Sequence, residues 1–193
     1  MNPVDLDDHP DEDGRVSGAN PAGRPENSWW REEYGSPCRE CGFDWSIEPE
    51  EAIRAVEGLP GAWAGVLAGT TGNEVPPAAT WSAKAYVFHV ADNLRIFAER
   101  LEGVRAGGPR DLIGYDENEL AAARHYEEMS LPAALWSIGS AVPLWAAASR
   151  SAVAADTTFG HSERGGLRAS EIVRAPAHDA LHHDWDLRRA VSR

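Results

Sequence analysis

A pair of histidines near the end of the sequence has a spacing that suits metal binding. His178 and His182 stand in the segment His178-Asp-Ala-Leu-His182-His183-Asp-Trp-Asp. On an α-helix, residues i and i+4 lie on one face, so both imidazoles can point to one place. His89 lies in another helix-like segment. If the three converge, they form a metal site with one coordination position open for water or a substrate.

A second metal-ligand pattern is Cys38-Arg-Glu-Cys41-Gly, which is half of a zinc knuckle. A complete site needs two further ligands from histidines, acids or a second chain. The histidines not used above are His9, His125, His161 and His183. The pair could instead be redox-active, although no thioredoxin-like βαβ pattern surrounds it. The remaining interpretation is two ordinary thiols on an aromatic segment.

Composition excludes several classes of protein. The formal net charge is −13, and residues 1–33 contribute −6 of it through nine acids and three arginines. No basic cluster occurs, which disfavours nucleic acids and anionic membranes as partners. No apolar run approaches the roughly 20 residues that span a bilayer. The acidic start does not resemble a signal peptide, and only two cysteines occur. These features predict a cytoplasmic protein.

Basic residue usage indicates the kind of host. Lys84 is the single lysine, against seventeen arginines, and alanine and glycine are abundant. Such usage is typical of GC-rich genomes, and it favours an actinobacterial origin.

The elements that must position these ligands are predicted to be helical. Residues 1–33 carry too few apolar side chains to form a core and are expected to be a disordered acidic tail. Residues 34–48 form an aromatic extension that holds the cysteines. Residues 49–193 are expected to form an all-α, antiparallel four-helix bundle with a long connection.

The four helices are expected at about 49–68, with a kink or break at Pro60-Gly61, at 80–104, from Ser130 onward, and at 170–190. Thr80 and Ser130 are the expected N-caps, and a shorter helix is expected at 117–128. No strand-like alternation of useful length appears. Pro176 is expected to start or kink the last helix.

Helical periodicity places the polar residues of the second helix on different faces. His89 and Asn93 flank the apolar surface and point partly into the bundle. The expected solvent-facing residues are Lys84, Asp92, Arg95 and Glu99. The second helix can therefore present one histidine to the interior.

On the last helix, His178, His182, Trp185 and Arg189 share one face. Asp179 and His183 point to a neighbouring face, where they can pair with each other. Asp179 could also hydrogen-bond to a metal ligand without binding the metal itself.

Two segments resemble DinB-like proteins. Trp81-Ser-Ala-Lys-Ala-Tyr-Val-Phe-His89-Val-Ala-Asp92 looks like their second helix, and the segment from His178 to Asp186 resembles their fourth. Ile113-Gly-Tyr-Asp-Glu-Asn-Glu and Glu163-Arg-Gly-Gly-Leu add to the likeness, which spans 49–193. The resemblance implies a four-helix bundle with a metal held by His89, His178 and His182. Pro176 departs from the pattern.

Three neutral imidazoles suit Zn²⁺, and also Ni²⁺, Fe²⁺ or Mn²⁺. Relatives implied by the resemblance include mycothiol-dependent maleylpyruvate isomerase and mycothiol and bacillithiol S-transferases. A thiol S-transferase or thiol-assisted isomerase is therefore expected, in which a metal-bound thiolate, most simply mycothiol, attacks a small electrophile. Further pocket candidates are Asn93, Tyr115, Asp116, Trp185 and Arg189.

Two alternatives stay open. The bundle could be a metal hydrolase that uses bound water without a thiol. It could also be a non-catalytic binding protein that senses metal or thiol stress through Cys38 and Cys41. A homodimer is compatible with the sequence.

Overall fold

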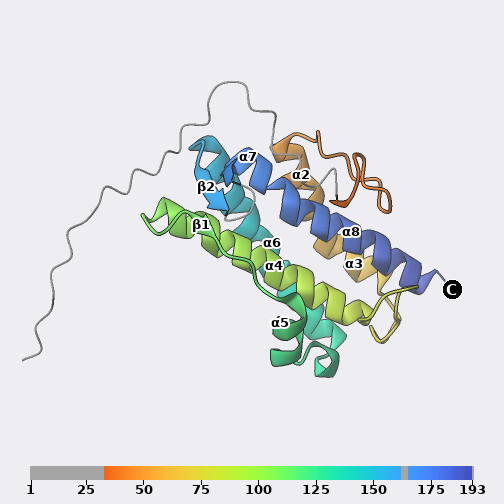
Figure 1. The fold of residues 1–193 in the computed structure, drawn as a ribbon. Coiled ribbons are helices and arrows are strands. Elements are labelled where there is room, and N and C mark those ends of the chain that lie inside the picture. Colours follow the sequence, from red (N-terminus) through yellow and green to blue (C-terminus); the bar gives the residue numbers. More distant parts are fainter. Residues whose placement is uncertain (1–32, 162–164, 193) are drawn as a thin grey trace, which may run out of the picture.

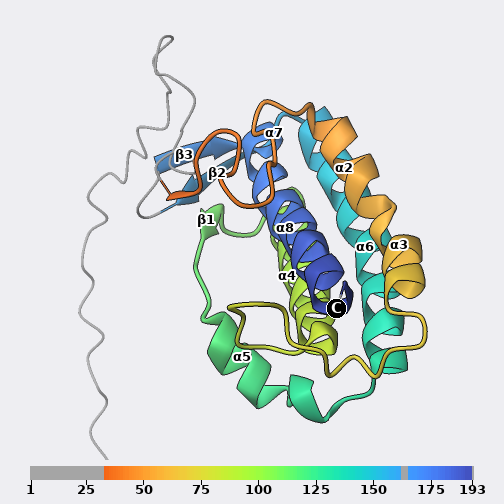
Figure 2. The same cartoon turned by 90° about the vertical axis from the view of Figure 1, so that its right-hand side faces the viewer.

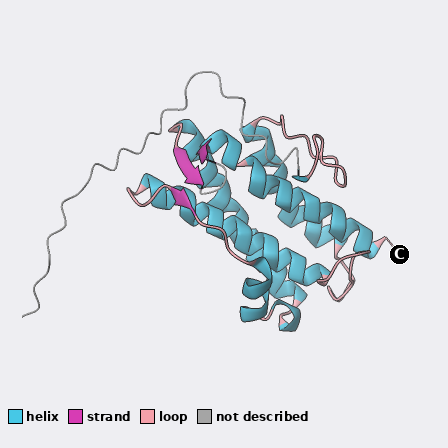
Figure 3. Ribbon diagram, in the orientation of Figure 1, coloured by secondary structure: helices cyan, strands magenta, loops and turns pink. Residues whose placement is uncertain are grey.

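The predicted helices form, and caps and prolines set their ends. The computed structural model describes residues 33–161 and 165–192, which build a helical bundle with a small sheet at one end (Figure 1, Figure 3). The acidic tail predicted at 1–33 lies almost entirely outside these residues. The first helical unit is α2 (Pro49–Glu57) followed by α3 (Leu59–Val66). The predicted break is confirmed, and it falls at Gly58 because Pro60 fits the first turn of α3.

The two long central helices start at serine caps. α4 (Ala83–Arg105) begins after Ser82, whose side chain accepts a hydrogen bond from the backbone of Ala85. The prediction of Thr80 as the cap was wrong by two residues. α6 (Leu131–Ala154) begins after Ser130, as predicted, and Ser130 accepts from the backbone of Ala133. Each cap satisfies one backbone donor of the first turn.

The connection between these helices holds α5 (Glu117–Ala123) and a 3-10 turn, η1 (Tyr126–Glu128). The single short helix predicted at 117–128 is therefore divided. His125 separates the two pieces with a left-handed backbone at φ 54°.

The last helical unit is α7 (Ala169–Ile172) followed by α8 (Arg174–Val191). Pro176 lies in the first turn of α8. Backbone N–H groups there have no acceptor within the helix, so the N–H that proline lacks costs no helical hydrogen bond. The proline therefore starts the helix rather than kinking it. The residues from His178 onward follow in helical register.

A small sheet is the element that the sequence analysis missed. It consists of β1 (Asp111–Leu112), β2 (Thr158–His161) and β3 (Gly165–Arg168). β1 pairs with β2 in parallel, and β2 pairs with β3 antiparallel. Strands of two to four residues are too short to show a readable alternation. Phe159 and Leu167 bury the sheet against the bundle.

The four helical units pack in a ring, with α4 between α6 and α8, and α2–α3 between the same two helices (Figure 2). A four-helix bundle with a long connection is thus confirmed. α4 and α6 run in the same direction, because Ser82 meets Glu127 at one end and Arg110 meets Thr158 at the other. The chain between them returns along the bundle. α4 and α8 are antiparallel, because His89 lies beside Asp179 and Tyr86 lies beside His183.

Two predicted solvent-facing residues of α4, Asp92 and Lys84, lie in the interior instead. Asp92 is buried and accepts hydrogen bonds from Arg95, Arg124 and Tyr126. Lys84 is also buried. The chain around 124–126 covers this face of α4, and periodicity alone could not show that.

α6 is long and apolar enough to cross a membrane by length and composition. In the structure it packs along α4, and its buried face includes Ile138, Val142 and Trp145. A core helix of a bundle has the same composition. The cytoplasmic location and the homodimer stay predictions.

Candidate metal centres

α8 presents two i, i+4 pairs to two different groups of ligands. His178 and His182 meet Cys38 and Cys41, whereas Asp179 and His183 meet His89 of α4. In each group, one ligand atom from every residue lies within 4.8 Å of the others. The two pairs are offset by one residue, or about 100° around the helix. The two clusters therefore lie on neighbouring faces of the same stretch of α8.

The first group, His89, Asp179 and His183, has the spacing of metal ligands. His89 Nε2 lies 3.3 Å from Asp179 Oδ1, and His183 Nε2 lies 3.5 Å from the same oxygen. Ligand atoms at about 2.0–2.1 Å around a tetrahedral ion stand about 3.3–3.4 Å apart. The donor set thus fits a divalent ion with little rearrangement. We call this group the His89 centre.

Outer hydrogen bonds hold the ligands of the His89 centre. Asn93 Nδ2 donates to Asp179 Oδ2 at 2.8 Å, and Tyr115 Oη donates to Asn93 Oδ1 at 3.1 Å. His183 Nδ1 lies 3.0 Å from Asp186 Oδ2. A carboxylate on the far nitrogen fixes the tautomer of a ligating histidine and leaves Nε2 for the ion.

Aromatic rings border the His89 centre. The ring of Trp81 lies 5.2 Å from that of His89, and the ring of Tyr86 lies 4.6 Å from that of His183. His89 is buried, and Asp179 and His183 are partly exposed. The centre thus has an apolar wall and keeps partial access from solvent.

Electrostatics couple the ligands of the His89 centre. Burial opposes charge on both Asp179 and His183, but interactions with neighbouring groups outweigh it. The imidazole of His89, and then the hydrogen bond to His183, hold the pKa of Asp179 well below its usual range. Burial lowers the pKa of His183, yet hydrogen bonds to Asp179 and Asp186 raise it to about 9. A proton on His183 therefore balances Asp179 when no ion is present.

The structure does not gather the predicted set of His89, His178 and His182 into one group. It places His89 with Asp179 and His183, and it places His178 and His182 with the cysteines. The reason is the rotation of α8 about its axis. α4 faces the side of α8 that carries Asp179 and His183, and His178 and His182 lie on the neighbouring side. The missed residues are Asp179 and His183, whose own i, i+4 spacing was the available signal.

The second group combines the two cysteines with His178 and His182, and we call it the cysteine centre. His178 is 5% exposed, and its Nε2 has no hydrogen-bond partner among the described residues. Burial and then the nearby His182 lower the pKa of His178 to about 4. The pKa of the Cys41 thiol is raised to about 11, because the effect of burial is larger than the opposing effect of a backbone hydrogen bond from Phe43. An unpaired buried group costs about 1–3 kcal/mol.

Of the predicted spare ligands, the two whose side chains are described do not lie at the cysteine centre. His125 is exposed and lies 3.4 Å from Glu128. His183 belongs to the His89 centre. His9 lies outside the described residues, and the side chain of His161 is not described either. The histidines that lie with the two cysteines are His178 and His182, which the sequence pattern placed with His89.

The other predicted pocket residues divide between roles. Asn93 and Tyr115 support the His89 centre, as described above. Asp116 is exposed and caps α5 by accepting from the backbone of Asn118 and Glu119. Trp185 lies beside His182 at 5.5 Å, and Arg189 stacks on Trp185 at 4.0 Å. These last two therefore border the cysteine centre.

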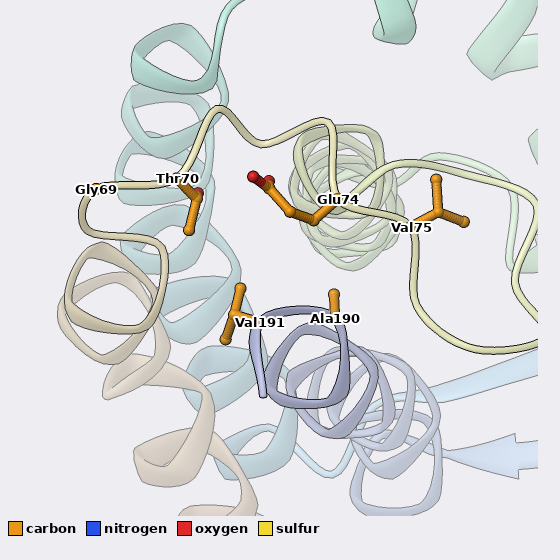
Figure 4. Close-up of a pocket in the computed structure, with 6 residues that line it drawn as sticks. All are labelled: Gly69, Thr70, Glu74, Val75, Ala190 and Val191. Carbon is orange, nitrogen blue, oxygen red and sulfur yellow. The ribbon is translucent and has the colours of Figure 1, made fainter. Parts of the chain in front are cut away.

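A cavity of about 380 Å³ lies near the end of α8 (Figure 4). Its walls are Gly69, Thr70, Glu74, Val75, Ala190 and Val191. No ligand of either centre lines it, so its contents would not meet the His89 centre directly.

Comparison with known proteins supports the fold. No family model matches the chain, and no curated protein matches it. A solved structure of YfiT from Bacillus subtilis is similar, with a TM-score of 0.59 and 15% identity over 74% of this chain and 83% of that chain. YfiT is described as a probable metal-dependent hydrolase with an unusual four-helix bundle topology. At this identity the likeness concerns the fold.

Proposed function

We propose that this chain is a metal-dependent hydrolase whose divalent ion is held by His89, Asp179 and His183. The observation that carries the proposal is the convergence of these three ligand atoms from α4 and α8. Two histidines and one carboxylate are the ligand set of several hydrolytic zinc enzymes. Three protein ligands leave a position open. The description of YfiT as a probable metal-dependent hydrolase agrees with this choice.

An ion bound there would act as a Lewis acid, lowering the pKa of a water or thiol and polarising a carbonyl group. Zn²⁺, Ni²⁺, Fe²⁺ and Mn²⁺ all suit this mixed nitrogen and oxygen set. Asp179 offsets one of the two positive charges of such an ion. The remaining positive charge favours an anionic nucleophile next to the ligands.

The residues around the ligands fix the geometry before any substrate binds. Asn93 holds one oxygen of Asp179, and the Tyr115 hydroxyl holds Asn93. Asp186 fixes the ring of His183. Trp81 and Tyr86 keep water from one side, which strengthens electrostatic interactions at the site. These contacts orient the ligands without reorganisation, which is what catalysis by electrostatic stabilisation requires.

A second candidate function is a thiol S-transferase or thiol-assisted isomerase that uses mycothiol and a small electrophile. The resemblance to DinB-like proteins supports it, and so do the aromatic rings beside both histidine ligands. Sulfur makes favourable contacts with aromatic rings. A free thiol has a pKa of about 8.5 and is mostly protonated at neutral pH, so a cation is needed to stabilise the reactive thiolate.

One assay separates these functions. The full chain is loaded with each of the four ions, and reporter esters, amides and electrophiles are offered with and without mycothiol. Hydrolysis without thiol that disappears in His89→Asn supports the hydrolase. Conjugation or isomerisation only with thiol, lost in the same variant, moves the assignment to the transferase or isomerase.

His125→Asn is the matched control, because His125 is exposed and belongs to neither centre. It should keep full activity. Metal binding at the His89 centre without turnover of any reporter would contradict both enzyme proposals and favour a non-catalytic binding protein.

A further inference from the structure

We propose that Cys38, Cys41, His178 and His182 bind a structural Zn²⁺ ion that fastens segment 34–48 to α8. The site is separate from the His89 centre and does not depend on the proposed enzymatic function. Two thiolates and two imidazoles are a frequent ligand set of structural zinc. Four protein ligands complete a tetrahedral ion and leave no position for a substrate.

Convergence from distant parts of the chain is the first observation. The cysteines lie in the turn before α2, and the histidines lie about 140 residues later on α8, yet their ligand atoms gather within 4.8 Å. The Cys-x-x-Cys spacing is the usual spacing of one half of a zinc site. Cys38 and Cys41 are free thiols, so no disulfide occupies them.

Unpaired nitrogens are the second observation. His178 Nε2 and His182 Nδ1 are buried and have no hydrogen-bond partner within the part of the chain that the structure describes. His178 is 5% exposed, so water reaches it poorly. Buried polar atoms normally find a partner, and a metal ion would supply one to both nitrogens. His182 Nε2 lies 3.4 Å from Glu40 Oε2, so this nitrogen can donate to Glu40 and leave Nδ1 free to bind an ion.

The local backbone shapes the cysteine turn. Gly42 donates its backbone N–H to Cys38 O at 3.0 Å, and Cys38 donates its N–H to Phe43 O at 2.9 Å. Gly42 has a φ of +76°, which side chains other than glycine rarely adopt. The glycine therefore lets the chain reverse directly after Cys41, so that both sulfurs face the same side.

The charge balance of the cysteine centre suits a buried position. Two thiolates neutralise Zn²⁺, and two neutral imidazoles add no charge, so the filled centre is neutral overall. Its surroundings are apolar, since Tyr34, Phe43 and Trp45 pack their rings within 5.3 Å of the His178 ring. A neutral metal centre avoids the cost of a bare charge in such a place.

This arrangement gives segment 34–48 a defined role. The segment lies beside the start of α8 (Figure 2). Its Cys38, Phe43 and Trp45 form a small apolar cluster, against which Leu181 of α8 packs. A small cluster like this provides little stability by itself, and small units often depend on a bound metal. The zinc would convert the cluster into a fixed cover for the start of α8, and the two thiol protons would leave to solvent on binding.

The experiment measures zinc released by a thiol reagent. The full chain, purified without chelators, is titrated with p-hydroxymercuribenzoate, and released zinc is detected with 4-(2-pyridylazo)resorcinol. We expect release of one zinc ion per chain, and none from Cys38→Ser or Cys41→Ser. His125→Asn is the matched control and should release as much as the unchanged chain.

A second measurement covers the case in which the cysteine variants fail to fold. The unchanged chain is loaded with Co²⁺ in place of zinc, and thiolate-to-cobalt charge-transfer absorption in the near ultraviolet is recorded. Its presence supports the site. Absence of this absorption, or full zinc content in Cys38→Ser, would overturn the proposal. Neither readout measures activity, so failure of the hydrolase proposal would leave the result unaffected.

Discussion

His182 and His183 are neighbours in the sequence, but their imidazoles belong to different clusters of ligands. Their ring centroids lie 5.7 Å apart, and their planes stand at 90° to each other. His182 faces Cys38 and Cys41, and His183 faces His89. One turn of α8 thus supplies ligands to two centres, and a one-residue shift decides which centre a side chain serves.

The first prediction concerns the support of Asp179. Asn93→Ala removes the donor to Asp179 Oδ2, so the carboxylate is no longer held in one orientation. Loss of such an outer contact typically lowers metal affinity by about 10–100-fold. Tyr115→Phe should have a smaller effect in the same direction, because its hydroxyl reaches Asn93 rather than Asp179. Competition with a chromophoric chelator measures both affinities. Equal affinity in Asn93→Ala and the unchanged chain would contradict this role.

The second prediction is a pH dependence of metal binding at the His89 centre. Hydrogen bonds to Asp179 and Asp186 raise the pKa of His183 to about 9 despite its burial. A metal needs the neutral imidazole, so a proton must leave His183 whenever the pH is below that value. Affinity should therefore rise by up to about tenfold per pH unit from neutral pH and level off near pH 9.

Calorimetry in buffers of different ionisation enthalpy checks this, using a chain whose cysteine centre is already filled. At neutral pH about one proton should be released for each ion that binds. An affinity that stays constant between neutral pH and about pH 9 would rule out the proton on His183.

The third prediction concerns the buried carboxylate of Asp92. Asp92→Ala leaves Arg95, Arg124 and Tyr126 without their shared acceptor. Removing one partner from a buried ionic network costs about 3–5 kcal/mol, so the free energy of unfolding should fall by about this amount. Glu99→Ala on the same helix is the control, because Glu99 is exposed and should change it by less than about 0.5 kcal/mol. Urea titration compares them, and similar midpoints would contradict the network.

The fourth prediction concerns the link between α3 and α8. Trp63 is fully buried, and its indole Nε1 donates to Asp184 Oδ1 at 2.9 Å. Trp63→Phe removes this donor to a charged acceptor, which should lower the free energy of unfolding by about 1.5–3 kcal/mol. Trp136→Phe is the matched control, since Trp136 is 74% exposed on α6. Equal losses in both variants would show that the hydrogen bond contributes little.

The sequence predicted the helices well, because their signals are local. Ser130 caps α6, and Ile138 and Val142 on its apolar face are buried at helical spacing. The break near Pro60 and the helix around His89 were also found. The small sheet was missed, because its pairing joins residues 111–112 to 160–161 and depends on how the helices bring those ends together.

The candidate sites were harder, because ligand sets depend on the rotation of α8 against its neighbours. The i, i+4 rule selects His178 with His182 and Asp179 with His183 equally well. The resemblance to DinB-like proteins favoured the first pair. No local signal in the sequence shows that segment 34–48 folds back onto α8 and lies against that pair. The structure groups His89 with Asp179 and His183 rather than with His178 and His182.

The most direct test of the two-centre arrangement compares His182→Asn with His183→Asn, two substitutions at adjacent positions. Both chains are loaded with Co²⁺, and bound metal and thiolate-to-cobalt absorption are measured. We predict that His183→Asn loses the ion of the His89 centre and keeps the thiolate absorption, whereas His182→Asn loses that absorption and keeps the other ion. Loss of the same ion in both variants would contradict the assignment and return His182 and His183 to a single site.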